Sequence, residues 1–189
     1  MKYNPDIHHR RSIRLKDYDY AQAGMYFVTI VTQNRECLFG DVQDGKRVLN
    51  DAGDVVKSVW DEMPEYYTGV GIDECIIMPN HLHGIVAINN VGAGPRACPQ
   101  EEGHPQGGAP TLSLPDVVHR FKSLSTTRYS RGIIEYGWPP FNGKLWQRNY
   151  YEHIIPNEEE LNTIREYIAN NPIKWDLDKE NPAVIGREQ

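Results

Sequence analysis

Hydrophobic residues in the first half of the chain predict three strands. The segment 25–32 (MYFVTIVT) is rich in aromatic and β-branched residues, which predicts a strand largely buried on both faces. The segments 72–78 and 82–88 are also apolar, and the turn-forming pair Pro79-Asn80 separates them. These two runs therefore predict an antiparallel pair of strands.

Three further segments have the spacing of amphipathic helices. In 51–66 and 113–130 apolar residues recur every three or four positions, which is the period of a helix. A third helix is predicted to begin after Asn157, a helix-capping residue, and to stop before Pro172. Ahead of this last helix, the segment 146–155 favours a short edge strand.

This order of elements predicts an α+β protein with a ferredoxin-like antiparallel sheet and helices packed on one face of it. We expect a single domain over residues 21–178, preceded by a basic arm at 1–20 and followed by a tail at 179–189. The segment 89–112 is rich in Gly and Pro and contains almost no apolar residue, so we expect it to be a mobile insertion in the domain.

Composition narrows the class of protein. The 189 residues are 39% hydrophobic and 24% charged, which is ordinary for a globular domain, and the mean hydropathy is −0.62. The sequence has no apolar run of the roughly 18 to 20 residues that a membrane span needs, and its first residues do not resemble a secretory signal. Cys37, Cys75 and Cys98 are far apart, which argues against a disulfide scaffold. We therefore expect a cytoplasmic protein.

Charge is distributed unevenly along the chain. The net charge of −6 alone argues against a nucleic-acid partner, but basic residues gather within 1–16 and again between 119 and 148. Nearby charges set the field that a phosphate meets, so a local basic face can still bind nucleic acid, although such faces are often merely solvated. The candidate phosphate contacts are Arg10, Arg11, Arg14, Arg120, Lys122, Arg128 and Arg148.

His81 and His83 are the first candidates for chemistry. They flank Leu82 in a predicted strand, where alternate residues point to the same face, so their imidazoles emerge side by side. Two neutral imidazoles form half of a site for a divalent metal. By itself the pair is a weak indication, because histidines at this spacing also occur in packed cores.

Tyr167 and Asn171 are the second pair. They lie four residues apart at the end of the last predicted helix and so share a face, although a packing residue and a helix cap would look the same. If these side chains and the two histidines converge on one metal ion, the tyrosine hydroxyl could attack a phosphodiester whose charge the ion offsets. The residues alone do not choose among DNA, RNA and a small phosphodiester.

The motifs around these residues resemble those of a known family. The run 78–86 (MPNHLHGIV) resembles the HUH motif, His-apolar-His, of single-strand transposases with one catalytic tyrosine. The runs 146–155 (WQRNYYEHII) and 166–174 (EYIANNPIK) are similar to the REP-associated tyrosine transposases of that superfamily. The resemblance covers most of residues 20–178, and the combined motifs are far more specific than either part.

The resemblance implies an HUH endonuclease fold and a transposase: a metal-dependent endonuclease and strand transferase that cleaves single-stranded DNA near hairpin-forming repeats through a 5′-phosphotyrosine intermediate. His81, His83 and Asn171 would bind Mg²⁺ or Mn²⁺, and Tyr167 would be the nucleophile. His153 matches a recurring histidine of the family and is a candidate to contact DNA. The sequence does not choose between a monomer and a homodimer.

Two other functions stay open. A domesticated protein would bind hairpin DNA without transposition, and a metal-dependent hydrolase of a small phosphodiester would use water as its nucleophile. The complete set of two histidines, a tyrosine and an asparagine favours the enzyme, because binding alone needs no aligned tyrosine. Tyr150 and Tyr151 offer other hydroxyls, but packing in the edge strand is the better interpretation of both.

Overall fold

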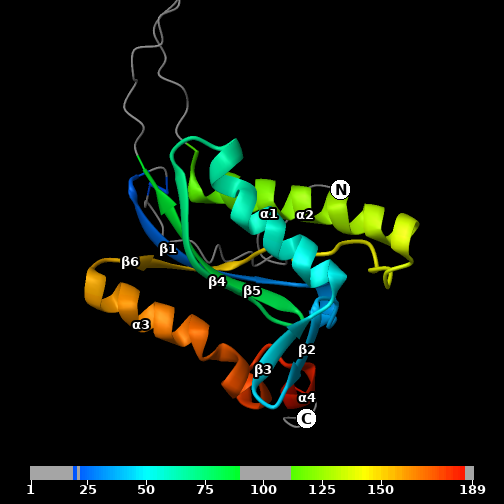
Figure 1. Cartoon of the computed structure of the whole chain (residues 1–189). Helices are drawn as coiled ribbons and strands as arrows, with labels where there is room; N and C mark the ends of the chain where they lie inside the picture. The colour runs from blue at the N-terminus through cyan, green and yellow to red at the C-terminus, as the bar shows by residue number, and fades with distance from the viewer. Residues whose placement is uncertain (1–18, 21, 90–111, 186–189) are drawn as a thin grey trace, which may run out of the picture.

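The computed structural model describes residues 19–20, 22–89 and 112–185 (Figure 1). Most of the predicted arm and insertion lies outside the described residues, and so do Arg10, Arg11, Arg14 and Cys98. The strands are β1 (Gly24–Val31), β2 (Gly40–Gln43), β3 (Lys46–Leu49), β4 (Val70–Ile77), β5 (His81–Ile88) and β6 (Tyr151–Ile155). The helices are α1 (Asp51–Tyr66), α2 (Leu114–Tyr136), α3 (Glu158–Ala169) and α4 (Pro182–Ile185), with 3-10 segments η1 (Gln33–Arg35) and η2 (Asn171–Leu177).

Four of the strands form one antiparallel sheet in the order β4-β5-β1-β6. This order fits the ferredoxin-like antiparallel sheet that the sequence predicted. The apolar runs on either side of Pro79-Asn80 pair with each other as β4 and β5. The edge strand β6 is shorter than predicted, since only residues 151–155 pair with β1 and Trp146 forms an isolated bridge with Thr32.

Helices cover both faces of this sheet. The ribbon shows α1 and α2 together on one side of the strands and α3 along the other (Figure 1). Alternate residues of β1 divide accordingly: Val28 and Ile30 belong to the larger core with α1 and α2, and Phe27 belongs to the smaller core with α3. The prediction that all the helices pack on one face is therefore wrong. A central strand that is apolar on both sides needs a cover on each of them.

Local signals explain where the helices begin. Ser113 and Asp116 form a capping box at the start of α2, and the Asn157 side chain accepts a hydrogen bond from the backbone N–H of Glu160 at the start of α3. The helix α2 continues past residue 130, where its prediction stopped, and ends at Gly137 with φ 70°. Glycine adopts this left-handed conformation without steric cost, so it ends the helix there.

The hairpin of β2 and β3 was not predicted. Its turn is Asp44-Gly45, and both residues have positive φ, 51° and 68°. This dipeptide is a known signal for a two-residue hairpin turn, and it was available in the sequence. The flanking strands are only four residues long and weakly apolar, which is why the pattern of hydrophobic positions missed them.

The chain after η2 returns to the body of the protein. Glu180 forms an ion pair with Arg35, and the buried side chain of Asn181 donates a hydrogen bond to the carbonyl oxygen of Trp175. The described part of the predicted tail, 179–185, thus contacts the domain. Among the described residues, no helix is both long enough and apolar enough to cross a membrane.

Candidate active site

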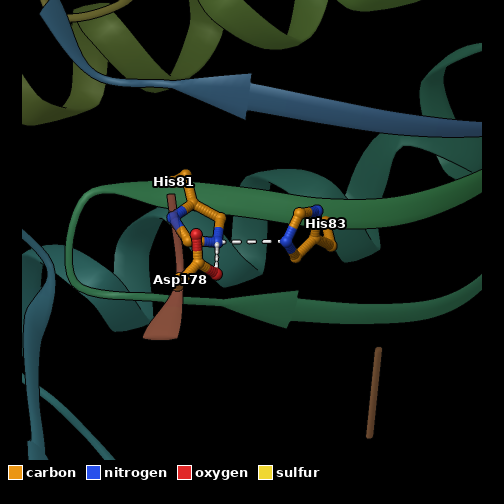
Figure 2. A group of neighbouring side chains, drawn as sticks. All are labelled: His81, His83 and Asp178. Carbon is orange, nitrogen blue, oxygen red and sulfur yellow. Dashed lines mark hydrogen bonds and ion pairs between the residues drawn. The ribbon is translucent and has the colours of Figure 1, made fainter. Parts of the chain in front are cut away.

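His81 and His83 open β5 and point to the face of the sheet that α3 covers. Their partners in the register are Val31 and Thr29 of β1, on the same face as Phe27. Both imidazoles are almost fully buried. Figure 2 shows them turned toward each other, and 3.1 Å separates the two Nε2 atoms. The strand alternation expected from the sequence therefore places the pair side by side.

Asn80 determines which nitrogen of His81 carries the hydrogen. The Asn80 Nδ2 group donates to the carbonyl oxygens of Arg35 and Glu180, at 3.1 and 2.7 Å. Its Oδ1 therefore faces His81, 2.9 Å from Nδ1. An amide oxygen only accepts hydrogen bonds, so the hydrogen of His81 lies on Nδ1 and Nε2 presents a lone pair to the site.

Thr29 orients the second imidazole in a similar way. Its hydroxyl lies 2.8 Å from Nδ1 of His83. A hydroxyl can either donate or accept, so His83 can keep its hydrogen on Nδ1 and present Nε2 as a lone pair as well. Both histidines thus have an outer partner on Nδ1 and an inward Nε2, which is the usual arrangement for histidine ligands of a metal.

Asp178, which sequence reasoning missed, completes this cluster. It directly follows η2, and its carboxylate oxygen Oδ2 lies 3.8 Å from Nε2 of His81 (Figure 2). One ligand atom from each of His81, His83 and Asp178 lies within 4.8 Å of the others, as is needed to hold a metal ion. The run DLDKE around Asp178 resembles an ordinary solvated stretch, so no sequence signal marked this residue.

Asn171 lies at the same place, although it is not part of α3 as predicted. The helix ends at Ala169, and Asn171 begins η2. Its side chain is buried, and its Oδ1 has no hydrogen-bond partner. A buried oxygen without a partner is costly, and a bound cation would satisfy it.

Burial keeps both histidines neutral. It lowers the pKa of His81 to about 4, while the nearby Asp178 and the Asn171 side chain act in the opposite direction. Burial also lowers the pKa of His83 well below its usual value, and His81 and Lys179 add to this effect. Neutral imidazoles are the form that binds metals, so the two side chains are prepared for that role at neutral pH.

Tyr167 approaches the cluster from α3. Its hydroxyl lies 3.4 Å from Nε2 of His83, and the side chain is 40% exposed. Burial, followed by the charge of Asp178, raises the pKa of Tyr167, whereas the amide of Asn171 lowers it. The phenol is therefore protonated at neutral pH, and positive charge beside it would be needed to favour its deprotonation. The four side chains that the sequence paired, His81, His83, Tyr167 and Asn171, do come together.

Two of the basic residues predicted to contact phosphate, Arg120 and Arg128, lie away from this cluster and have other partners. Arg128 forms a two-pronged ion pair with Glu62 of α1, and the Arg120 guanidinium lies 4.6 Å from the centre of the Tyr67 ring. Both arginines belong to α2, on the opposite face of the sheet from Tyr167. The contact of Arg128 with Glu62 joins α2 to α1, and the contact of Arg120 with Tyr67 joins α2 to the residue that follows α1.

Lys122, Arg148 and His153 differ in their settings. Lys122 points inward and donates to the carbonyl oxygens of residues 147–149, and burial lowers its pKa to about 8. Arg148 is exposed, and His153 forms a short contact with Glu160 of α3. Trp146, in the same segment, is buried in the larger core.

The comparisons with known proteins agree with this geometry. The family model described as "Transposase IS200 like" matches residues 107–171, which include Tyr167 and Asn171. An uncharacterised protein of Haemophilus influenzae is 44% identical over 184 residues, covering 94% of this chain and 96% of that protein. A second protein of the same organism, assigned by name to the REP-associated tyrosine transposases, is 25% identical and covers 82% of this chain and 74% of its own length.

A solved structure has a similar fold. It is described as a REP-associated tyrosine transposase bound to a REP hairpin, and its TM-score is 0.54 at 16% sequence identity. The match covers 85% of this chain and 73% of that chain. At this level of identity the likeness concerns the fold alone.

An antiparallel sheet that carries a His-apolar-His pair opposite a tyrosine on a helix defines the fold of the HUH transposases with one tyrosine. Residues 107–171 of the chain match the IS200-like transposase family, in agreement with the resemblance to REP-associated tyrosine transposases predicted from the sequence. The family match and the fold support an enzyme of the transposase type.

Proposed function

We propose that this protein is a metal-dependent tyrosine nuclease and strand transferase that acts on single-stranded DNA next to hairpin-forming repeats. The observation that supports this best is the position of the Tyr167 hydroxyl, 3.4 Å from a buried imidazole of the His-apolar-His pair. Hairpin DNA as the substrate is supported by the related fold described as bound to a REP hairpin.

The residues around His81 fit one divalent cation. The inward Nε2 atoms of His81 and His83, the partnerless Oδ1 of Asn171 and the carboxylate of Asp178 would hold it. Mixed nitrogen and oxygen ligands suit several divalent ions, and Mg²⁺ or Mn²⁺ is our proposal for this protein. When bound, the ion would supply positive charge against the scissile phosphate.

Tyr167 would act as the nucleophile. Its oxygen attacks the phosphorus and loses the phenolic proton, and the bond from phosphorus to the 3′ oxygen breaks. The 3′ oxygen leaves as a hydroxyl after taking up a proton, and the 5′ phosphate remains on Tyr167 as a phosphotyrosine ester. Because this ester keeps the energy of the broken phosphodiester, another 3′ hydroxyl can displace the tyrosine and join the strands without a nucleotide cofactor.

The covalent intermediate gives a direct test. The protein is incubated with Mn²⁺ and labelled single-stranded hairpins from the host genome, and a denaturing gel is searched for a protein–DNA adduct. We expect an adduct with the parent protein and with Tyr136→Phe, an exposed tyrosine of α2, but none with Tyr167→Phe.

The other outcomes separate the alternative functions. An adduct that persists in Tyr167→Phe would contradict the assignment of the nucleophile. Native gel shifts with hairpins and no adduct from any variant would favour a DNA-binding protein. Turnover of a small phosphodiester that survives Tyr167→Phe would instead favour a hydrolase that uses water.

The cation site is tested by binding rather than by cleavage. Titration calorimetry with Mn²⁺ should show affinity at least tenfold weaker in Asp178→Asn and in Asn171→Ala than in the parent protein, since each variant removes one ligand. Asp176→Asn, an exposed acidic residue of η2, is the matched control and should bind as the parent does. Unchanged affinity in Asp178→Asn would remove that residue from the proposed ligand set.

A further inference from the structure

A cavity of about 370 Å³ adjoins Tyr167. Its floor is one face of β1, where Phe27, Thr29 and Val31 alternate with residues of the larger core. Tyr167 and His83 form one wall, so an occupant of the cavity would lie next to the phosphate that Tyr167 attacks. The volume is within the range of about 300–1,000 Å³ that is typical of small-molecule sites.

The register of the sheet explains why this space exists. His83, Thr29 and Tyr151 are paired across β5, β1 and β6, so their side chains form one row on the same face. Adjacent strands are about 4.8 Å apart, which leaves the outer two residues separated by about two strand spacings. The short Thr29 side chain between two rings leaves a gap, and the gap is the floor of the cavity.

The opposite wall offers an aromatic surface. Tyr151 is 49% exposed, and its ring makes an edge contact with Phe27 at 6.3 Å between ring centroids. Tyr167 makes an edge contact with the same phenylalanine at 5.9 Å. Phe27 therefore contacts both tyrosines, and Tyr151 is a cavity wall rather than the packing residue that the sequence suggested.

Polar and charged groups surround the rest of the cavity, including the ion pair of Arg35 with Glu180. Gln147 and Asn149 line it from the segment before β6, and Lys179 lies with its Nζ 5.9 Å from the centre of the Tyr151 ring. Amide side chains can donate to and accept from the edge of a base, and an ammonium group can neutralise a phosphate. Aromatic rings beside such groups are the usual means of holding unpaired bases.

We propose that this cavity binds the unpaired nucleobase next to the phosphate that Tyr167 attacks. Tyr151 stacks on the base, Gln147 and Asn149 contact its edge, and Lys179 faces the neighbouring phosphate. The proposal rests on the function proposed above, which it extends from chemistry to recognition of the substrate. A base in a duplex is stacked and paired and cannot enter, so the cavity makes the enzyme select single-stranded DNA.

The inward-pointing Lys122 supports this site from the other side of the sheet. Its Nζ donates hydrogen bonds to the carbonyl oxygens of residues 147–149 and lies 5.4 Å from the centre of the Tyr150 ring. These bonds fix the backbone that carries Gln147 and Asn149 into the cavity. A segment without regular secondary structure is thereby held in place for contact with a base.

The experiment uses the hairpin strand that forms an adduct with the full chain, with 2-aminopurine placed in turn at each position beside the cleaved phosphate. Binding is measured in EDTA, so that no cleavage occurs. We expect quenched fluorescence at one position in the parent protein and in Tyr151→Phe, which keeps the ring. In Tyr151→Ala the quenching should disappear and Kd should rise about tenfold. Tyr136→Ala, which removes an exposed ring outside the cavity, should behave as the parent does.

An abasic nucleotide completes the comparison. At the quenched position it should weaken binding of the parent protein about tenfold and cause no further loss in Tyr151→Ala, because the two changes remove the same contact. If an adduct forms but Tyr151→Ala binds and quenches as the parent does, the cavity is not a base site and the proposal is overturned. If no hairpin forms an adduct with the parent protein, the proposed function itself fails, and the two failures are thus distinguishable.

Discussion

At the scale of single residues, the site depends on where each imidazole holds its hydrogen. Asn80 directs the Nε2 lone pair of His81 inward, toward the carboxylate of Asp178 and the imidazole of His83. Neither a lone pair nor a carboxylate can donate a hydrogen bond, so these groups do not satisfy one another. The same residues become complementary once a cation lies between them, which is the physical basis of the proposed metal site.

The buried imidazole of His81 leads to a pH dependence of stability. Its pKa is about 4 in the folded protein against about 6.5 when unfolded, so between these values the unfolded chain binds more protons. Stability from this residue is complete above pH 6.5 and is lost as pH falls toward 4. In urea unfolding with EDTA, we expect His81 to account for about 2 kcal/mol of the stability lost between pH 7.5 and pH 5.

Substitution isolates this contribution from that of other titrating groups. Between pH 7.5 and pH 5, the free energy of unfolding of His81→Gln should fall by about 2 kcal/mol less than that of the parent protein. This difference should hold whatever the stability of the variant at pH 7.5. His119→Gln, at an exposed position of α2, is the matched control for the substitution itself. Equal slopes in the parent and in His81→Gln would mean that His81 is not held neutral by burial.

At the scale of elements, a glycine sets the distance between α1 and the sheet. The ring of Trp60 in α1 lies against Gly84 of β5, and a Cβ built there would be 2.4 Å from a ring carbon. Gly84→Ala should therefore destabilise the protein by about 1–3 kcal/mol in urea unfolding, through overpacking. Gly24→Ala in β1, where the nearest contact of the new Cβ would be an ordinary 3.4 Å, should reduce the free energy of unfolding by less. A smaller loss of stability for Gly84→Ala than for Gly24→Ala would contradict this interpretation.

Lys122 connects α2 to the segment before β6. Its amine has three carbonyl partners and is buried enough to lower its pKa to about 8, so the contact supports the structure from inside. Lys122→Met leaves these carbonyls without their donor and should reduce the free energy of unfolding by about 1–3 kcal/mol. Lys57→Met, which removes an ion pair with Asp61 on the surface of α1, should change the free energy of unfolding by less than about 1 kcal/mol. Equal losses of stability in Lys122→Met and Lys57→Met would argue against the anchoring role of Lys122.

At the scale of the whole molecule, the two helical layers differ in how firmly they are packed. The helix α1 buries six of its sixteen residues, whereas α3, which carries Tyr167, buries only Leu161 and Ile168 of its twelve. Helices with less buried apolar surface open more readily. In hydrogen exchange followed by mass spectrometry, we expect amides of α3 to exchange faster than those of α1, and the opposite order would show that the smaller core is the more stable one.

Metal binding should slow hydrogen exchange only in the residues next to the proposed site. Asn171 and Asp178 bracket η2 directly after α3, so a cation bound to them would hold the end of the helix against β5. Added Mn²⁺ should therefore slow exchange in residues 167–178 and leave α1 unchanged. Slower exchange in α1 to the same extent would indicate a general effect of the ion rather than binding at this site.

Much of this protein could be read from local patterns. Alternation in β5 put His81 and His83 on one face, capping residues marked the starts of α2 and α3, and the run MPNHLHGIV with the C-terminal motif indicated the family. These features depend on residues within a few positions of one another, and backbone geometry alone relates them. The sequence by itself therefore determined the order of elements along the chain, the two histidines and the tyrosine that meets them.

The tertiary structure decided what depends on segments far apart in the chain. Covering both faces of the sheet requires knowing that β1 and β5 lie at its centre, which no local pattern states. Asp178 reaches His81 only because the chain turns back after η2. Lys122 points inward only because residues 147–149 lie beneath α2. Tyr151 becomes a cavity wall only because Thr29 is its neighbour in the sheet. Such contacts arise from packing between distant segments, and for that reason composition and spacing could not reveal them.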